Sequence, residues 1–459
     1  MDKVLREVKP SYDCERVLSL CLQACAYQSF RNGQKEALLA YVNAHVSSQC
    51  AAVLLPTSAG KSFLIQCAPV LNKWQGRPAL TLVVEPLINL LIEQDAKASK
   101  LGLKCVTVHG KQSGKTSVGL SIKKITDGDI VFLTPESLPT ISKLHSTAVG
   151  GIIIDEFHVI STWGRSFRPM YRSLGQLHIV YGRQVPILLL SATATRIVFE
   201  DVCESLCIPM RKMILSVHGS MHSNVAMFLK EKTSRLETDL RPLADIIHQV
   251  VRLPKEEQKG NSIIFFVHSF PTMVKVDAAL RCYPSAFIRG LCKTSSDLLH
   301  SLNHSKANQR ILEYSNTGRT LLTICTTAGS LGLDFQNVNY VFIYGGTSLE
   351  TMTQMIGRAG RRGQPSEVYI MARKSDLSRL RSQLTKHQVQ LSQAIAKERP
   401  ELKRAHKILE ASLTSTEDFL FNSQGRCLMV QLLKNFMGFR EGSRLTSISG
   451  SDGEVYLQN

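Results

Sequence analysis

Short apolar runs alternate with longer amphipathic stretches along most of the chain, in two series separated by a polar stretch from His218 to Gly260. Apolar runs that end in polar loops and precede helical patterns are typical of parallel strands buried on both faces. In the first series we expect a strand ending at Pro56 and strands at Thr81–Glu85, Lys104–His109, Asp129–Thr134, Gly151–Glu156 and Pro186–Ser191. In the second we expect strands at Ser262–Val267, Ser285–Arg289, Arg319–Thr326, Tyr340–Tyr344 and Glu367–Met371. The pattern predicts an α/β protein with two tandem parallel-sheet domains.

Helical patterns flank the two series. Residues 11–46 are mainly helical in pattern, with a break around Ser29–Gly33. After Met371, apolar residues recur near helical spacing among basic residues, and Pro400 ends this run. The Ser/Gly-rich segment from about Gly442 indicates a loose tail. We therefore expect a first domain over residues 1–215, a second over 216–375, a short helical C-terminal extension over 376–440 and a flexible tail over 441–459.

Composition narrows the class of protein. A chain of 459 residues favours two or three domains, and its formal net charge of +18 favours a polyanionic partner. The twelve cysteines include no CxxC pair, which argues against a complete zinc ribbon and fits a reducing compartment. No apolar run reaches about 18 residues, so we expect no membrane span. The expected location is intracellular, and nuclear if the source is eukaryotic.

The strongest local signal lies between the first expected strand and the helix after it. Small residues there let backbone N–H groups approach a phosphate, a lysine adds a cation, and a serine is placed to bind Mg²⁺. The strict phosphate-loop pattern fails because Leu55 occupies its first glycine position, and a plain turn is the alternative. The candidate residues are Thr57, Ser58, Ala59, Gly60, Lys61 and Ser62.

Two adjacent carboxylates end the strand expected at Gly151–Glu156. Asp155 could hold Mg²⁺ directly or through water, and Glu156 could position and polarise an attacking water. Aromatic residues mixed with arginine follow, and such a mixture can stack on bases and bind phosphates. A buried strand with solvated acids at its end is the alternative. The aromatic-rich run contains Trp163, Phe167, Arg168 and Tyr171.

Two other polar groups are candidates for nucleotide contact. Near the helical break, Arg31 and Gln34 could bind an adenine, although polar residues at a helix start are common on surfaces. In the second series, Arg358 and Arg361 are three residues apart, so on a helix they would share one face. That face could deliver two guanidinium groups to a γ-phosphate on the other domain. A solvent-exposed basic helix is the alternative.

In their order and spacing, these segments resemble the superfamily-two helicases and, within them, the RecQ family of DNA helicases. The resemblance runs from about Tyr27 to Ile370. The matching segments are Tyr27 with Phe30–Gln34, Pro56–Ser62, Val83–Gln94, Asp155–His158 and Ser191–Thr193. The aromatic-rich loop that marks RecQ enzymes is matched by Ser161, Trp163-Gly164, Phe167-Arg168-Pro169 and Tyr171. In the second domain, Gly332, Asp334, Gln354, Arg358 and Arg361 fit the family motifs.

The resemblance implies two RecA-like (P-loop NTPase) domains that bind ATP and Mg²⁺ and move 3′→5′ on single-stranded or partly duplex DNA. It assigns phosphate and metal binding to Lys61, Ser62 and Asp155, and water activation to Glu156. It assigns nucleotide binding also to Tyr27, Arg31, Gln34, Gly332 and Asp334, and completion of the site to Arg358 and Arg361. It assigns nucleic-acid contact and coupling to His158, Ser161, Trp163, Phe167, Arg168, Ser191, Thr193 and Gln354.

Some positions depart from the family pattern. Phe157 stands where a small residue is usual, and we expect it to crowd the pocket beside the catalytic water. Arg426-Cys427 resembles the start of the family's zinc module, but no cysteine follows, so zinc is not expected in this chain. Two alternatives stay open: an RNA-dependent ATPase of the same superfamily, and a degenerate protein that binds nucleic acid without unwinding it.

Overall fold

The chain forms two compact units, the first built from residues up to 218 and the second from residues 224 onward. The computed structural model describes residues 1–7, 13–46, 50–57, 59–109, 122–164, 168–181, 185–218, 224–294, 296–300, 305–326, 334–396, 398–423, 427–428 and 431–432. The flexible tail expected over 441–459 lies outside these residues. Within them, no helix is both long enough and apolar enough to cross a membrane.

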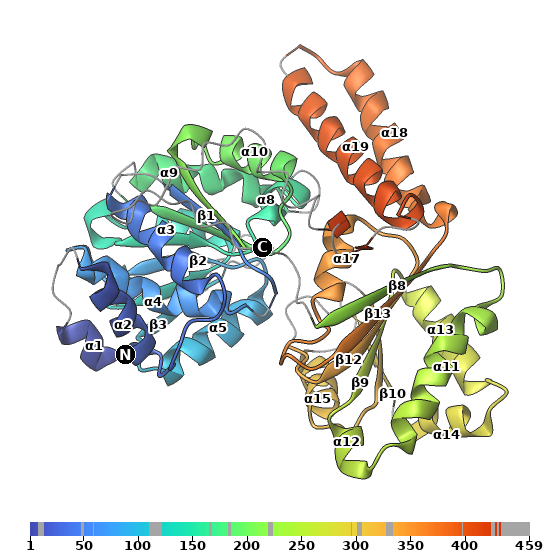
Figure 1. Ribbon diagram of the computed structural model, residues 1–459. Coiled ribbons are helices and arrows are strands. Elements are labelled where there is room, and N and C mark those ends of the chain that lie inside the picture. The colour runs from blue at the N-terminus through green and yellow to red at the C-terminus, as the bar shows by residue number, and fades with distance from the viewer. Residues whose placement is uncertain are drawn as a thin grey trace. The chain divides into compact units, whose positions relative to one another are not determined.

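The first unit is organised around a seven-stranded sheet in which every pairing is parallel. Its strand order is β3-β4-β2-β5-β6-β1-β7, and helices lie on both faces (Figure 1). Residues of the central strands are buried, as expected for a sheet covered on both sides. The strands are β1 (Cys50–Leu54), β2 (Thr81–Val84), β3 (Cys105–Val108), β4 (Ile130–Leu133), β5 (Gly151–Ile154), β6 (Ile187–Ser191) and β7 (Met213–Val217).

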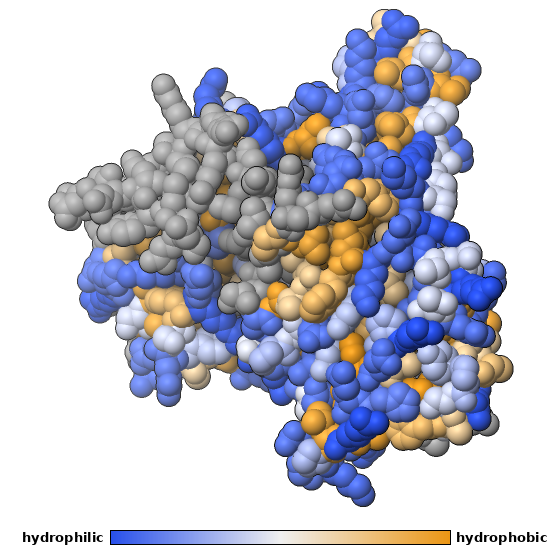
Figure 2. Space-filling view, turned by 45° about the vertical axis from the view of Figure 1, so that its right-hand side comes forward, coloured by the Kyte–Doolittle hydropathy of each residue, from blue (hydrophilic) through white to orange (hydrophobic). Residues whose placement is uncertain are grey.

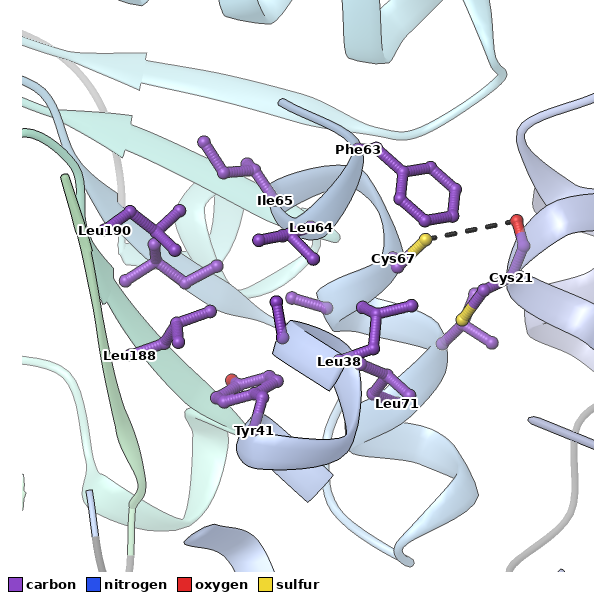
Figure 3. Close-up of a cluster of buried hydrophobic side chains, with 14 of the residues drawn as sticks. Cys21, Leu38, Tyr41, Phe63, Leu64, Ile65, Cys67, Leu71, Leu188 and Leu190 are labelled. Atoms are coloured by element: carbon purple, nitrogen blue, oxygen red, sulfur yellow. Dashed lines mark hydrogen bonds between the residues drawn. The ribbon is translucent and has the colours of Figure 1, made fainter. Parts of the chain in front are cut away.

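The core of the first unit forms where helices pack on this sheet. Leu38 and Tyr41 of α3 meet Leu64 of α4 and Leu188 of β6 in one apolar cluster (Figure 3). The Cys67 thiol of α4 donates to a carbonyl of α2, which ties a third helix to the cluster. The helices are α1 (Asp2–Glu7), α2 (Cys14–Ala24), α3 (Gln34–Val46), α4 (Lys61–Trp74), α5 (Ile88–Lys100), α6 (Ile122–Thr126), α7 (Leu138–Ile141), α8 (His158–Thr162), α9 (Gly175–Tyr181) and α10 (Arg196–Ser205).

The second unit contains a six-stranded parallel sheet of order β10-β11-β9-β12-β13-β8. Its strands are β8 (Val225–Glu231), β9 (Ser262–Val267), β10 (Ser296–Leu299), β11 (Leu322–Thr326), β12 (Val338–Tyr344) and β13 (Ser366–Ala372). Its helices are α11 (Leu236–Arg252), α12 (Lys255–Lys259), α13 (Phe270–Arg281), α14 (Ala286–Thr294), α15 (Ser305–Asn316), α17 (Leu349–Ile356), α18 (Ser378–Gln393) and α19 (Arg399–Phe421). Two parallel sheets followed by two helices confirm the predicted fold class.

One strand prediction is wrong, and three strands were not predicted. The segment Ser285–Arg289 begins helix α14 instead of forming a strand, because Ser285 Oγ accepts from the N–H of Ile288 and Ile288 is buried on the helix's inner face. Its apolar residues are too few to separate a strand from a helix by pattern. The unpredicted strands are β7, β8 and β10.

The helical extension forms a pair of adjacent helices, α18 and α19, in the second unit (Figure 1). Pro400, expected to end the first helical run, lies in the first turn of α19, where proline's missing N–H costs no hydrogen bond. Ile395, one of the apolar residues that recur after Met371, is 63% exposed. On the face of the molecule that Figure 2 shows, hydrophilic residues predominate and apolar residues gather in smaller groups.

Candidate active site

The candidate residues of the first unit lie at the carboxyl edge of its sheet. Lys61 begins α4 after β1, Asp155 and Glu156 follow β5, and Ser191 ends β6. Strands β5, β6 and β1 are consecutive neighbours in the sheet. Segments far apart in the sequence therefore meet at the edge where open α/β sheets bind ligands.

The loop before α4 is closed by a side chain from another helix. Gly60 has a left-handed backbone with φ of +90°, and a Cβ placed there would lie 2.2 Å from Gln34 Nε2. Gln34 Nε2 donates to the Ala59 carbonyl at 2.9 Å, and Gln34 Oε1 accepts from Arg31 N at 2.8 Å. Gln34 thus holds the loop in the structure, and its predicted contact with adenine stays a prediction.

The remaining residues of the predicted nucleotide group surround this loop. Tyr27 is 52% exposed and packs edge-on against Phe63 of α4, with ring centroids 5.5 Å apart. The Arg31 side chain is exposed, and Thr57 lies in the turn after β1. Ser58 lies outside the described residues.

A continuous line of contacts joins the phosphate loop to the end of β6. Lys61 Nζ lies 3.2 Å from Glu156 Oε1, and His158 Nδ1 lies 3.3 Å from Glu156 Oε2. His158 Nδ1 is also 2.8 Å from Ser191 Oγ, which accepts from Thr193 N at 3.2 Å. Five of the predicted site residues are therefore connected side by side in the structure.

Glu156 occupies an unusual backbone conformation. Its φ is +46°, in the left-handed region that non-glycine residues rarely adopt, and its N–H donates to Asp155 Oδ1 at 2.9 Å. Strain at a residue this well held points to a functional constraint. Burial acts to raise the pKa of Glu156, but Lys61 and His158 outweigh it and hold that pKa well below its ordinary value. Glu156 is thus a carboxylate at neutral pH.

A third acid, Glu85, lies beside these two. It follows β2, is fully buried, and neither of its carboxyl oxygens has a hydrogen-bond partner among the described residues. Burial, Asp155 and Glu156 raise its pKa well above the ordinary value, against an opposing effect of Lys61. Burial and the charge of Glu156 also raise the pKa of Asp155 to about 6. Three carboxyl groups therefore lie near Lys61, which places a positive charge among them.

These groups fit the Mg²⁺ that accompanies ATP. Asp155 is buried at the strand end, and the Ser62 hydroxyl accepts a hydrogen bond from Gln94 Nε2 at 3.0 Å. Within the described ranges, no three acidic, histidine or cysteine side chains converge as a direct metal site. Mg²⁺ is commonly held by one or two protein ligands together with phosphates and water, and this donor set matches that arrangement.

The aromatic-rich loop is anchored by Arg168. Its guanidinium donates to both Glu136 oxygens at 2.6–2.9 Å and to the Pro86 carbonyl, and it lies 5.3 Å from the Tyr171 ring centroid. Trp163 meets Tyr171 edge-on, with centroids 6.2 Å apart. Arg168 is thus held against Glu136 and Tyr171, and its predicted contact with nucleic acid stays a prediction. Ser161 is buried in α8, and Phe167 lies outside the described residues.

The expectation that Phe157 crowds the pocket is wrong. Its ring is fully buried and packs edge-on against Phe199 of α10, with centroids 6.0 Å apart. Its side chain therefore belongs to the packing of α8 on α10.

In the second unit, the helix expected to carry both arginines ends at Ile356, before Arg358. Gly360, with φ of +68°, turns the chain, and Asn224 Nδ2 donates to its carbonyl at 3.0 Å. Arg361 forms an ion pair with Asp334, which joins two predicted residues. Gln354 lies in α17, and Gly332 lies outside the described residues.

The sequence assigned no individual role to three side chains near this edge: Glu85, Gln94 and Glu136. Glu85 carries the same signal as Asp155, an acid directly after a run of apolar residues, so the pattern could have found it. Gln94 and Glu136 are recognised only by their contacts with Ser62 and Arg168, which depend on tertiary structure.

Asp155→Asn is expected to stabilise the nucleotide-free fold. Because the pKa of Asp155 is about 6 in the fold and 3.8 as a free side chain, the folded state binds the proton more tightly, and stability is lost as pH rises between these values. Above pH 6 the buried charge costs at most about 3 kcal/mol, which asparagine avoids. Thermal melting at pH 7.5 should show a higher midpoint for Asp155→Asn, and the gain should shrink at pH 5. The exposed Asp127→Asn is the control, and an unchanged or lower midpoint for Asp155→Asn would contradict the expectation.

Models of known protein families match both units. A model described as DEAD/DEAH box helicase matches residues 31–202, and a model described as helicase conserved C-terminal domain matches residues 242–363. The chain is 29% identical over 380 residues to ATP-dependent DNA helicase Q4 of Homo sapiens, covering 78% of this chain and 30% of that protein. It is 27% identical over 365 residues to ATP-dependent DNA helicase RecQ of Haemophilus influenzae, covering 78% of this chain and 54% of that protein. The chain thus spans about a third to a half of the length of these relatives.

Solved structures share the fold at low sequence identity. Dbp5 of S. cerevisiae, bound to RNA and ADP BeF3, matches with a TM-score of 0.55 and 14% identity over 90% of this chain and 99% of that chain. The helicase Lhr of Mycobacterium smegmatis, bound to ssDNA and AMP-PNP, matches with a TM-score of 0.54 and 15% identity over 89% of this chain and 57% of that chain. The two parallel-sheet units therefore share the fold of these solved structures.

Proposed function

We propose that the chain hydrolyses ATP to move along single-stranded DNA in the 3′→5′ direction. The chain belongs to the RecQ family of superfamily-two helicases, and the proposal proceeds from that membership. The observation that carries the proposal is the line of contacts from Lys61 through Glu156 and His158 to Ser191. It supplies a phosphate-binding cation, a carboxylate kept ionised, and a connection to a neighbouring strand end.

In the proposed reaction, Lys61 exchanges its ion pair with Glu156 for the phosphates of ATP. The left-handed turn at Gly60 leaves the backbone N–H groups at the start of α4 available to those phosphates. Ser62 and Asp155 would hold Mg²⁺, which when bound neutralises charge on the phosphate oxygens. Glu156, released from Lys61, orients the water that attacks the γ-phosphorus, and ADP leaves.

Coupling to DNA is proposed to run through His158 and the aromatic-rich loop. His158 touches both the hydrolytic carboxylate and Ser191, so a change at Glu156 alters a contact at the end of β6. Trp163 follows α8, which His158 begins, and bases can stack on such an aromatic for about 1–3 kcal/mol each. We assign Gln354, Arg358 and Arg361 to the same reaction by their match to the family motifs. For a eukaryotic source the proposed substrate implies a nuclear location.

Steady-state ATP hydrolysis with and without oligonucleotides tests the function. We expect single-stranded DNA to stimulate turnover of the full chain at least about tenfold, and an RNA of equal length to stimulate it much less. Stronger stimulation by RNA would identify an RNA-dependent ATPase of the same superfamily. No turnover under any condition, with nucleic-acid binding retained, would identify a non-catalytic binding protein.

Trp163→Ala is expected to separate the two activities. Removing the ring should leave DNA affinity within about threefold, because the +18 net charge supplies most of a sequence-independent attraction. DNA-stimulated turnover should nevertheless fall towards the basal rate. Fluorescence anisotropy with labelled oligonucleotide measures the first quantity and an ATPase assay the second. Trp163→Phe, which keeps an aromatic ring against Tyr171, is the matched control, and full stimulation of Trp163→Ala would refute the coupling role.

A further inference from the structure

Among the residues that the structure describes, Glu85 is a buried acid at the carboxyl edge that the proposed reaction does not use. Val84 of β2 is in register with Ile154 of β5, so the next residues, Glu85 and Asp155, stand side by side. Residues in register on adjacent parallel strands direct their side chains to the same face of the sheet. Asp155 N–H donates to the Val84 carbonyl at 3.0 Å, which fixes this alignment up to the two acids.

In the nucleotide-free fold, no described residue forms a hydrogen bond with the buried Glu85 carboxyl group. It is 0% exposed, and both of its oxygens lack a hydrogen-bond partner among the residues that the structure describes. Burying a carboxyl group in this way costs several kcal/mol, and an apolar residue would fill the position without that cost. A buried polar group in a ligand site can lack a hydrogen-bond partner when the site is empty. The ligand, or water that binds with it, then supplies that partner.

The surroundings of Glu85 indicate what that ligand is. Asp155 and Glu156 add negative charge beside it, and Lys61 is the cation whose charge opposes theirs. Burial, together with the charge of Glu85, raises the pKa of Tyr171, whose hydroxyl is likewise buried without a hydrogen-bond partner in the described part of the chain. A cluster with this excess of acidic groups attracts a divalent cation, and Mg²⁺ retains water that can donate to further carboxylates.

We propose that Glu85 is a third acidic group of the magnesium–nucleotide site, which it joins through water beside Asp155. The inference rests on the proposed function. Glu85 acts as a positioning residue, because direct contact with the metal is not supported by the spacing of the acids within the described ranges. Partners of this kind typically change metal affinity about 10–100-fold when they are removed.

The test measures metal binding directly in the full chain. Electron paramagnetic resonance titration with Mn²⁺ in the presence of a non-hydrolysable ATP analogue gives the dissociation constant of the metal in the ternary complex. Glu85→Gln, which keeps the shape and removes the charge, is expected to raise this constant about tenfold. Half-saturating Mg²⁺ for hydrolysis should rise in parallel, while turnover at saturating Mg²⁺ largely recovers.

Two further variants make the result specific. Glu93→Gln is the matched control, because Glu93 is partly exposed, pairs with Lys97 at 2.5 Å and also adds negative charge near Glu85. Glu85→Asp keeps the charge and is expected to bind Mn²⁺ more tightly than Glu85→Gln. If Glu85→Asp fails to fold, Glu85→Gln compared with the wild type and Glu93→Gln decides the question. If Glu85→Gln fails to fold, Glu85→Asp is compared with the wild type: binding within about twofold supports the role of the charge, and a loss of about tenfold overturns it.

The outcomes separate this inference from the proposed function. The inference is supported if the wild type binds Mn²⁺, Glu85→Gln binds it more weakly, and the affinity of Glu93→Gln is unchanged. If the wild type binds Mn²⁺ and the dissociation constant of Glu85→Gln is within about twofold of the wild-type value, the inference is overturned and the proposed function still stands. If Glu85→Asp loses as much affinity for Mn²⁺ as Glu85→Gln does, the role of the charge is overturned. Failure of the wild type to bind Mn²⁺ with the nucleotide overturns the proposed function, and the inference with it.

Discussion

Lys61→Ala is expected to lower DNA-stimulated ATP turnover by at least about 100-fold. The variant loses the cation that would meet the phosphates. It also leaves Glu156, Asp155 and Glu85 buried together without the lysine whose charge opposes theirs. Loss of Lys61 should therefore raise the pKa of Glu156 and weaken nucleotide binding at the same time. An ATPase assay with single-stranded DNA and a binding titration with a fluorescent ATP analogue measure the two losses.

The control for this variant is Lys97→Ala. Lys97 is an exposed lysine of α5 that pairs with Glu93 one helical turn earlier, and exposed pairs of this kind contribute little to stability. It should retain turnover within about twofold. Turnover of Lys61→Ala near the wild-type value would show that the loop before α4 is not the phosphate site.

Glu156→Gln is expected to lower the rate of the chemical step by about 10²–10⁴-fold while ATP binding is retained. Glutamine keeps the shape of the side chain but cannot accept a proton, and it ends the ion pair with Lys61. Because Lys61 then has no competing carboxylate at 3.2 Å, ATP affinity should be equal to or higher than that of the wild type. Single-turnover hydrolysis and equilibrium nucleotide binding separate the two effects.

Glu200→Gln is the matched control, because Glu200 forms an exposed i,i+4 pair with Arg196 on α10 of the same unit. If Glu156→Gln weakened ATP binding as strongly as it slowed hydrolysis, Glu156 would act in holding the nucleotide and not in activating water. A wild-type rate of hydrolysis would remove Glu156 from the reaction altogether.

The sequence predicted the parallel sheets well because their strands are short apolar runs with polar ends. β9 was placed at its observed bounds, and β5 was placed within two residues of its end. The failures share a cause. β8, an edge strand with alternating exposed residues, lies in a polar stretch, and the segment Ser285–Arg289 at the start of α14 is too short to show a helical period.

For the site, motif order predicted which residues meet, and the contacts follow for Lys61, Glu156, His158 and Ser191. The orientation of individual side chains could not be predicted. The Arg168 guanidinium points to Glu136, because this half-buried carboxylate, just after β4, accepts its hydrogen bonds. That preference depends on two segments far apart in the chain, which no local pattern records.

The buried acids have a consequence for selection experiments. Glu85 and Asp155 each place a carboxyl group where burial opposes its charge, so neutral replacements relieve a cost that the wild type carries. A library screened only for resistance to heat or protease should enrich amides or small polar residues at these two positions. Such clones would be robust and well expressed, yet impaired in the proposed reaction, so thermostable variants of this protein need a second screen for turnover. Proteins often trade stability for activity at such sites, and here the two positions directly follow the paired ends of β2 and β5.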